Sequence, residues 1–368
     1  MVSSTGIRGR APAMPAGAAG YRSLGNRSLG NRSLGLIQRF LSLPNHLAAA
    51  IAIVAAFSAI SLAIAAIYGA PLSIPRERVS AALGVSAVLP VSVAILLYVV
   101  LRLCKSLIGK GDDGAQPLWQ LVAVDLTLML LFLVVTYFHF SLKTWVQVIN
   151  PNLYDDSYFA VDRALQPVVD MFFWIRSTYF TLVPSVDAWY QAAFLLMFIS
   201  GFCSLAITRN PVYPRFCIAV LLTMSLGALS YLIAPALGPF IYEDGLNPAA
   251  TAAQAGMLQA HQQVMQYGMP WIAEAGPGYF TGALAAMPSL HITHAVVMTY
   301  FVHHARSPLF GLCLMICFWV GIESVASRWH YLIDLPAGLM LAGLIIWLTN
   351  RICQSNLRRS LVALPRAT

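Results

Sequence analysis

Apolar segments long enough to cross a membrane dominate this sequence. A helix of about 20 residues spans the roughly 30 Å hydrocarbon core of a bilayer. Only 10% of the 368 residues are charged, against about 25% in an average soluble domain. We therefore predict an all-α, polytopic membrane protein with about eight transmembrane helices, near residues 47–69, 81–104, 118–140, 190–208, 216–236, 288–305, 309–327 and 331–349.

Lysine and arginine are distributed unevenly between the segments that connect these spans. If the N-terminus is cytoplasmic, 16 of the 22 basic residues fall on the cytoplasmic side and six on the other side. Cytoplasmic loops are enriched in Lys and Arg, so we expect both termini inside the cell. The net charge of +8 then follows from the basic cytoplasmic segments, which are attracted to anionic lipid headgroups. It is no evidence for nucleic-acid binding. The compact length and the lack of a sorting signal favour a bacterial inner membrane.

Three segments outside the spans have a distinct composition. Residues 1–45 form a polar, basic tail in which RSLG occurs three times, and this tail has too little apolar surface to fold. Residues 141–189 are rich in aromatic and acidic side chains, which favours helices lying on the membrane surface. Residues 237–287 contain no Lys or Arg and include a helical stretch too polar to span the bilayer. We expect the last two segments to cover the extracytoplasmic face.

Two histidines are spaced so that they meet at one level of the membrane. His291 opens one span within AMPSLHITHA, and His330 lies in SRWHYLID after the next span. Their separation of 39 positions corresponds to two crossings of about 18 residues and a turn. Ionisable groups within membrane segments are costly and mark functional sites. We expect both histidines at the extracytoplasmic level.

The residues around these histidines favour phosphoryl transfer. Asp334 follows His330 by four positions, so on a helix its carboxylate would orient the imidazole and raise its basicity, as a nucleophile or base requires. Pro288 and Ser289 open the other helix, whose free N–H groups favour an anion. The Arg328 guanidinium is suited to phosphate oxygens. One histidine can attack phosphorus while the other protonates the leaving oxygen, so we expect neither a metal nor another cofactor.

AMPSLHITHA and SRWHYLIDLPAG resemble the second and third signature motifs of the type 2 phosphatidic acid phosphatase superfamily. They are most similar to the branch that includes inositol phosphorylceramide synthases and related bacterial proteins, in which Pro-Ser-x-His and His-Tyr-x-x-Asp-x-x-x-Gly are typical. The resemblance implies a six-helix core at about residues 118–350. Two additional transmembrane helices (46–117) precede this core, and a cytoplasmic tail (351–368) follows it.

The resemblance also implies roles for the site residues. His330 would be the nucleophile, Asp334 its orienting carboxylate and His291 the acid and base, while Ser289 would bind the phosphate. The reaction would pass through a phosphohistidine, and the partner would be a membrane lipid: a phospholipid, a lipid phosphate or a ceramide-like acceptor.

The chain departs from the superfamily's pattern in two places. The first motif contains a Lys and an Arg-Pro, whereas the corresponding loop here, APALGPF at 234–240, has no basic residue. The third motif often has Ser-Arg well upstream of its histidine, where this chain has Glu323-Ser324, and Arg328 lies closer. The synthase branch also lacks the strict first motif, which favours an inositolphosphotransferase-like enzyme of sphingolipid metabolism.

Other functions compete with this interpretation. If water is the acceptor, the protein is a lipid phosphate or polyprenyl diphosphate phosphatase. An inactive lipid-binding relative or a transporter would also explain buried acids and histidines and the missing basic motif. A zinc hydrolase built on His291, His294 and His330 lacks the HExxH pattern. The sequence leaves open the oligomeric state and the roles of His139, His294 and Glu323.

Overall fold

The computed structural model describes residues 45–76, 88–108, 118–184, 189–282 and 286–362. Within these residues all regular structure is helical and no strand occurs, which confirms the all-α prediction. The RSLG-containing tail and the beginning of the second predicted span lie outside the described residues.

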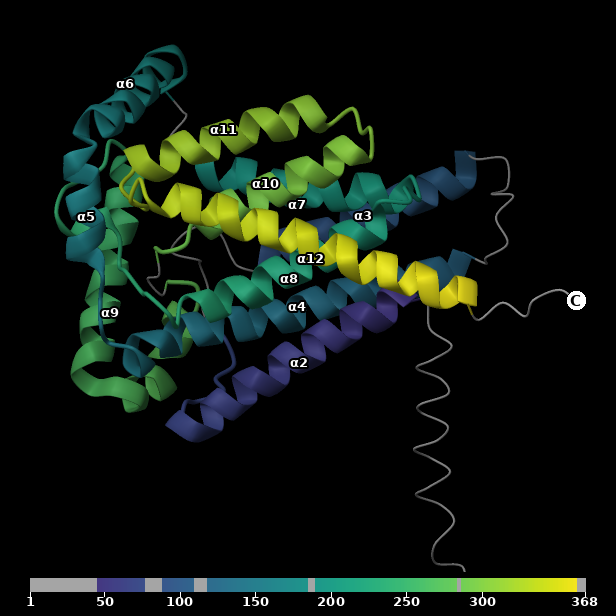
Figure 1. Ribbon diagram of the computed structural model, residues 1–368, viewed down its shortest axis with the longest axis horizontal. Helices are drawn as coiled ribbons and strands as arrows, with labels where there is room; N and C mark the ends of the chain where they lie inside the picture. The colour runs from purple at the N-terminus through teal and green to yellow at the C-terminus, as the bar shows by residue number, and fades with distance from the viewer. Residues whose placement is uncertain (1–44, 77–87, 109–117, 185–188, 283–285, 363–368) are drawn as a thin grey trace, which may run out of the picture. The chain divides into compact units, whose positions relative to one another are not determined.

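Eight helices coincide with the predicted spans (Figure 1). They are α2 (Asn45–Tyr68), α3 (Val88–Ile108), α4 (Leu118–Ile149), α7 (Trp189–Ile207), α8 (Tyr213–Ser230), α10 (Leu290–His304), α11 (Phe310–Ala326) and α12 (Asp334–Val362). Four of these are long and apolar enough to cross a membrane: α2, α4, α8 and the first 21 residues of α12. Residues Ala192–Ile207 of α7 and the whole of α11 are also apolar but shorter. Helix α10 packs against α7, α8, α11 and α12. Its buried residues, polar ones such as Thr293 and His294 included, therefore lie on several sides of the helix.

Three further helices lie at one end of this bundle, on the left in Figure 1. They are α5 (Asp155–Ala164), α6 (Gln166–Leu182) and α9 (Pro248–Glu274). Helix α6 packs against α11 and α9 packs against α4. They belong to the two segments in which the sequence predicts helices outside the spans. We call this end, where α10 and α12 begin and α11 ends, the site end of the bundle.

Helix α4 is longer than its apolar run. The sequence predicts a span that ends near residue 140, but α4 continues to Ile149. The assignment of residues 141–149 to a surface segment is therefore wrong. Polar side chains begin there, but apolar ones between them, such as Trp145, are buried and keep the helix in the bundle. As a result, Lys143 is held on a rigid core helix.

Helix α9 owes its start and its bend to local sequence. Asn247 caps it, because its side-chain oxygen accepts the N–H groups of the second and third following residues at 3.1 Å each, and Pro248 occupies the first helical position. Gly268 then adopts φ = 64°, two residues before Pro270. A positive φ and a proline both interrupt helical hydrogen bonding, so α9 kinks there.

Candidate active site

The starts of α10 and α12 are joined by backbone and side-chain hydrogen bonds. Ser289 caps α10, with its Oγ accepting the Ile292 N–H at 3.4 Å, and its own N–H donates to the Asp334 carbonyl at 3.2 Å. Thr293 Oγ1 donates to the Gly338 carbonyl at 3.1 Å. The Ser289 hydroxyl is fully buried, and because it accepts the cap bond its own proton remains available to donate.

Gly338 is the residue that allows this close approach. A Cβ at this position would lie 2.6 Å from the Ser289 carbonyl oxygen, whereas a Cβ at Gly343 on the same helix would meet open space. We predict that Gly338→Ala forces α12 away from α10 and lowers kcat at least about 10-fold, since an error of about 1 Å in a site is costly. Gly343→Ala should leave kcat unchanged, because alanine favours a helix over glycine. Equal kcat values for both variants would contradict this account.

His330 lies in the turn between α11 and α12. Its Nδ1 lies 3.2 Å from Asp334 Oδ2, which also accepts the Tyr331 N–H at 2.9 Å. An ionised carboxylate only accepts hydrogen bonds, so His330 Nδ1 carries the proton and Nε2 keeps its lone pair. The sequence interpretation placed His330 and Asp334 on one helix. This is wrong: α12 begins at Asp334, and the contact is made across a turn.

His291 faces the free nitrogen of His330. Its Nδ1 lies 3.4 Å from His330 Nε2, and the two ring centroids are 5.7 Å apart. Tyr190 and Phe194 of α7 pack against the His291 ring, at centroid distances of 5.4 and 5.0 Å. The structure thus brings the two histidines together, with a lone pair on one nitrogen facing the other ring.

Arg328 is buried among acids and aromatic rings. Its Nη1 lies 3.0 Å from Asp162 Oδ2 and its Nη2 lies 2.6 Å from Glu243 Oε1. The ring centroids of Phe159 and Phe173 lie 6.0 and 5.9 Å from its guanidinium carbon. The sequence predicts Arg328 as a phosphate ligand, but in the structure two carboxylates match its charge.

Glu323 connects three elements near His330. Its Oε1 accepts the Asn247 side-chain amide at 2.8 Å and the Ser327 hydroxyl at 2.5 Å, and its Oε2 lies 3.5 Å from Arg176 Nε. The acid therefore joins α11 to α6 and to the start of α9. These contacts surround the turn before His330 and do not include the imidazole itself.

Two acids of α5 organise the turn that carries His330, and the sequence prediction missed them. Asp155 accepts the Gly238 N–H at 2.9 Å and the Tyr331 hydroxyl at 2.6 Å. Asp162 accepts the Leu332 N–H at 2.8 Å. Burial raises the pKa of Asp162, although this N–H and the neighbouring guanidinium favour its charged form. Their spacing of seven positions, which puts both acids on one helix face, was the available signal.

His139 and His294 lie beside the histidine pair. His139 Nδ1 is 2.9 Å from the Met224 carbonyl, and His294 Nδ1 is 2.9 Å from the Leu290 carbonyl. Each Nδ1 therefore carries its proton, because a carbonyl can only accept. In the part of the chain that the structure describes, no group of three or more His, Cys, Asp or Glu side chains is placed to hold a metal ion.

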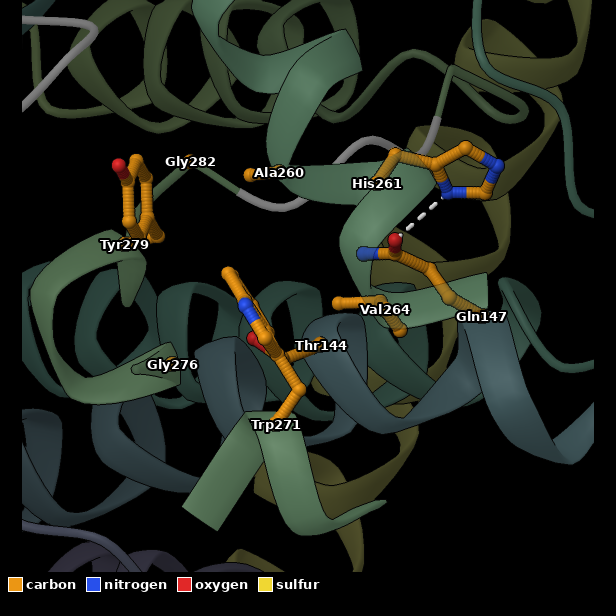
Figure 2. A pocket seen from close by; sticks show the side chains of 9 residues that line it. All are labelled: Thr144, Gln147, Ala260, His261, Val264, Trp271, Gly276, Tyr279 and Gly282. Carbon is orange, nitrogen blue, oxygen red and sulfur yellow. Dashed lines mark hydrogen bonds between the residues drawn. The ribbon is translucent and has the colours of Figure 1, made fainter. Parts of the chain in front are cut away.

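A separate small pocket lies between α4 and α9 (Figure 2). It is lined by Thr144, Gln147, Ala260, His261, Val264, Trp271, Gly276, Tyr279 and Gly282. His261 Nδ1 donates to the Gln147 amide oxygen at 2.7 Å, and burial lowers the pKa of His261. None of the five predicted site residues lines this pocket.

The comparison with protein families decides the classification. A model described as the PAP2 superfamily matches residues 159–348, which is more than half of the chain. The chain belongs to the PAP2 superfamily. Neither the curated proteins nor the solved structures include a match.

Membership in the PAP2 superfamily makes this chain an integral membrane protein of the lipid phosphatase and phosphotransferase type, with a lipid phosphate as substrate. The match extends to the superfamily and not to one of its branches. The match runs from α5 into α12, so it includes both histidines of the pair. It leaves out α4, which carries His139 and Lys143.

Proposed function

We propose that this PAP2 protein transfers a phosphoryl or phospho-headgroup from a lipid through a covalent intermediate on His330. One observation carries the proposal: His330 is bonded through Nδ1 to the buried Asp334, while its Nε2 faces His291. A carboxylate on one nitrogen orients a nucleophilic imidazole, and a second imidazole within reach can move a proton.

The proposed reaction has two displacement steps. His330 Nε2 attacks phosphorus, the bond from phosphorus to the leaving oxygen breaks, and protonated His291 gives its proton to that oxygen. His291 then takes the proton of an acceptor hydroxyl, whose oxygen attacks phosphorus and breaks the P–N bond. Asp334 stabilises the positive charge that develops on His330, and Ser289 donates a hydrogen bond to a phosphate oxygen.

We propose a lipid hydroxyl, such as that of a ceramide, as the acceptor. The support is the similarity of PSLH and HYLID to the inositolphosphotransferase branch, together with the absence of a basic residue from 234–240. Hydrolysis is the second candidate, because water can replace the hydroxyl in the second step without any other change.

We propose that the site end faces the extracytoplasmic side, as in a bacterial inner membrane. Lys105, Arg209, Arg215 and Arg306 all lie at helix ends or turns opposite the site end, and positive charge is retained in the cytoplasm. A site at this level can accept a headgroup from water while the acyl chains stay in lipid.

The test uses the purified full-length protein in detergent with EDTA present. Lipid phosphates, lipid diphosphates, and phosphatidylinositol with ceramide are supplied, and free phosphate and lipid products are measured together. We expect a new phospholipid without free phosphate, at a rate unchanged by EDTA. Release of phosphate instead would identify a phosphatase. Loss of turnover with EDTA that added zinc restores would contradict the metal-independent mechanism.

A further inference from the structure

Lys143 lies near the end of α4, at the site end of the bundle. Its Nζ lies 5.8 Å from the centroid of the Tyr231 ring. The same Tyr231 ring lies 6.2 Å, centroid to centroid, from the imidazole of His139, so Lys143 and His139 pack against one tyrosine. The side chain is only partly exposed, so bulk water does not fully solvate it.

Packing at the site end holds the turn of α4 that carries Lys143 in place. Val146, one turn beyond Lys143, forms a buried cluster with Tyr231 and Leu290. Leu290 lies directly between Ser289, the cap of α10, and His291. The backbone that carries Lys143 is therefore packed against the helix start that carries two of the site residues.

Lys143 differs from the two buried cations described at the site end, Arg176 and Arg328, in its partners. Arg328 is matched by Asp162 and Glu243, and Arg176 lies 3.5 Å from Glu323. Within the described ranges no Asp or Glu forms an ion pair with Lys143. An ammonium group that is only partly solvated and has no protein counter-charge favours the binding of an anion.

We infer that Lys143 binds the phosphate group of the lipid substrate and supplies the positive charge that the loop at 234–240 lacks. The inference rests on the proposed function, because it assumes that phosphorus is held at the histidine pair. The ligand class is a phosphate monoester or diester anion. This cation comes from a helix outside the segment that the superfamily model matches, and the loop at 234–240 contains no basic residue.

Binding of inorganic phosphate tests the inference without turnover. The full-length protein is titrated with orthophosphate at constant ionic strength, and its thermal stability is followed. We expect wild type to be stabilised and Lys143→Met to need about 10- to 100-fold more phosphate, which corresponds to the loss of one charge-assisted contact. Lys143→Arg should recover most of the affinity, because it keeps the charge.

Lys105→Met is the matched control, because Lys105 donates to the Ile207 carbonyl at the opposite end of the bundle. Equal phosphate affinity in Lys143→Met and wild type would overturn the inference, and so would a wild type that phosphate does not stabilise. A different result would contradict the proposed function. If His330→Gln retains full turnover while Lys143→Met loses phosphate binding, then His330 is not the nucleophile, but Lys143 still binds the phosphate anion.

Discussion

Replacement of His330 by glutamine should lower kcat at least about 10³-fold while the protein stays folded. Glutamine can still donate a hydrogen bond to Asp334, so the buried carboxylate keeps a partner. The variant has no lone-pair nitrogen facing His291, and a covalent intermediate cannot form. Steady-state kinetics with the donor and acceptor that wild type uses, together with a thermal melt, provide the measurement.

The control for this variant is His304→Gln. His304 is exposed at the opposite end of α10, where its Nδ1 lies 2.9 Å from the Tyr300 carbonyl. It should retain wild-type kcat. A His330→Gln protein with wild-type kcat would contradict a nucleophilic His330 and would favour a lipid-binding or transport function.

Replacement of Arg328 by alanine should destabilise the protein by about 3–5 kcal/mol. Removal of one partner of a buried ion pair leaves an uncompensated charge, here on Asp162, which is 1% exposed. The guanidinium also fills the space against Phe159 and Phe173, so its loss opens a cavity. We expect a large fall in melting temperature and in the yield of folded protein in detergent.

Arg163→Ala is the matched control, because Arg163 is exposed on α5 next to Asp162. Its melting temperature should stay near that of wild type. If Arg328→Ala keeps the wild-type melting temperature but loses turnover, then Arg328 is the phosphate ligand that the sequence predicts and its ion pairs are secondary.

Much of the helical architecture can be predicted from the sequence, because the bilayer imposes a length and an apolar composition on each span. The same approach fails at helix ends. Helix α4 runs to Ile149 because apolar side chains between its polar ones are buried. A hydropathy average over many residues does not show that one face of a helix is buried. The start of α12 at Asp334 depends on the turn around His330, which tertiary contacts determine.

The juxtaposition of His291 and His330 could be predicted because two helical crossings fix their spacing. The partners of Arg328 could not, because Asp162 and Glu243 lie far from it in sequence and no local pattern joins them. From the sequence, Lys143 is one of the six basic residues expected on the extracytoplasmic side, with no sign that it lies near the histidines. Its position beside the histidines depends on the packing of α4 against α8, which residue spacing does not encode.

The most direct test of the central claim is to trap the intermediate. Wild type and His330→Gln are mixed with a donor labelled with radioactive phosphorus, quenched within one turnover and analysed for label on the protein. The account predicts label on wild type that is stable to base and labile to acid, as expected for a phosphohistidine, and no label on His330→Gln. Turnover by wild type without any labelled protein, or equal labelling of both proteins, would contradict it.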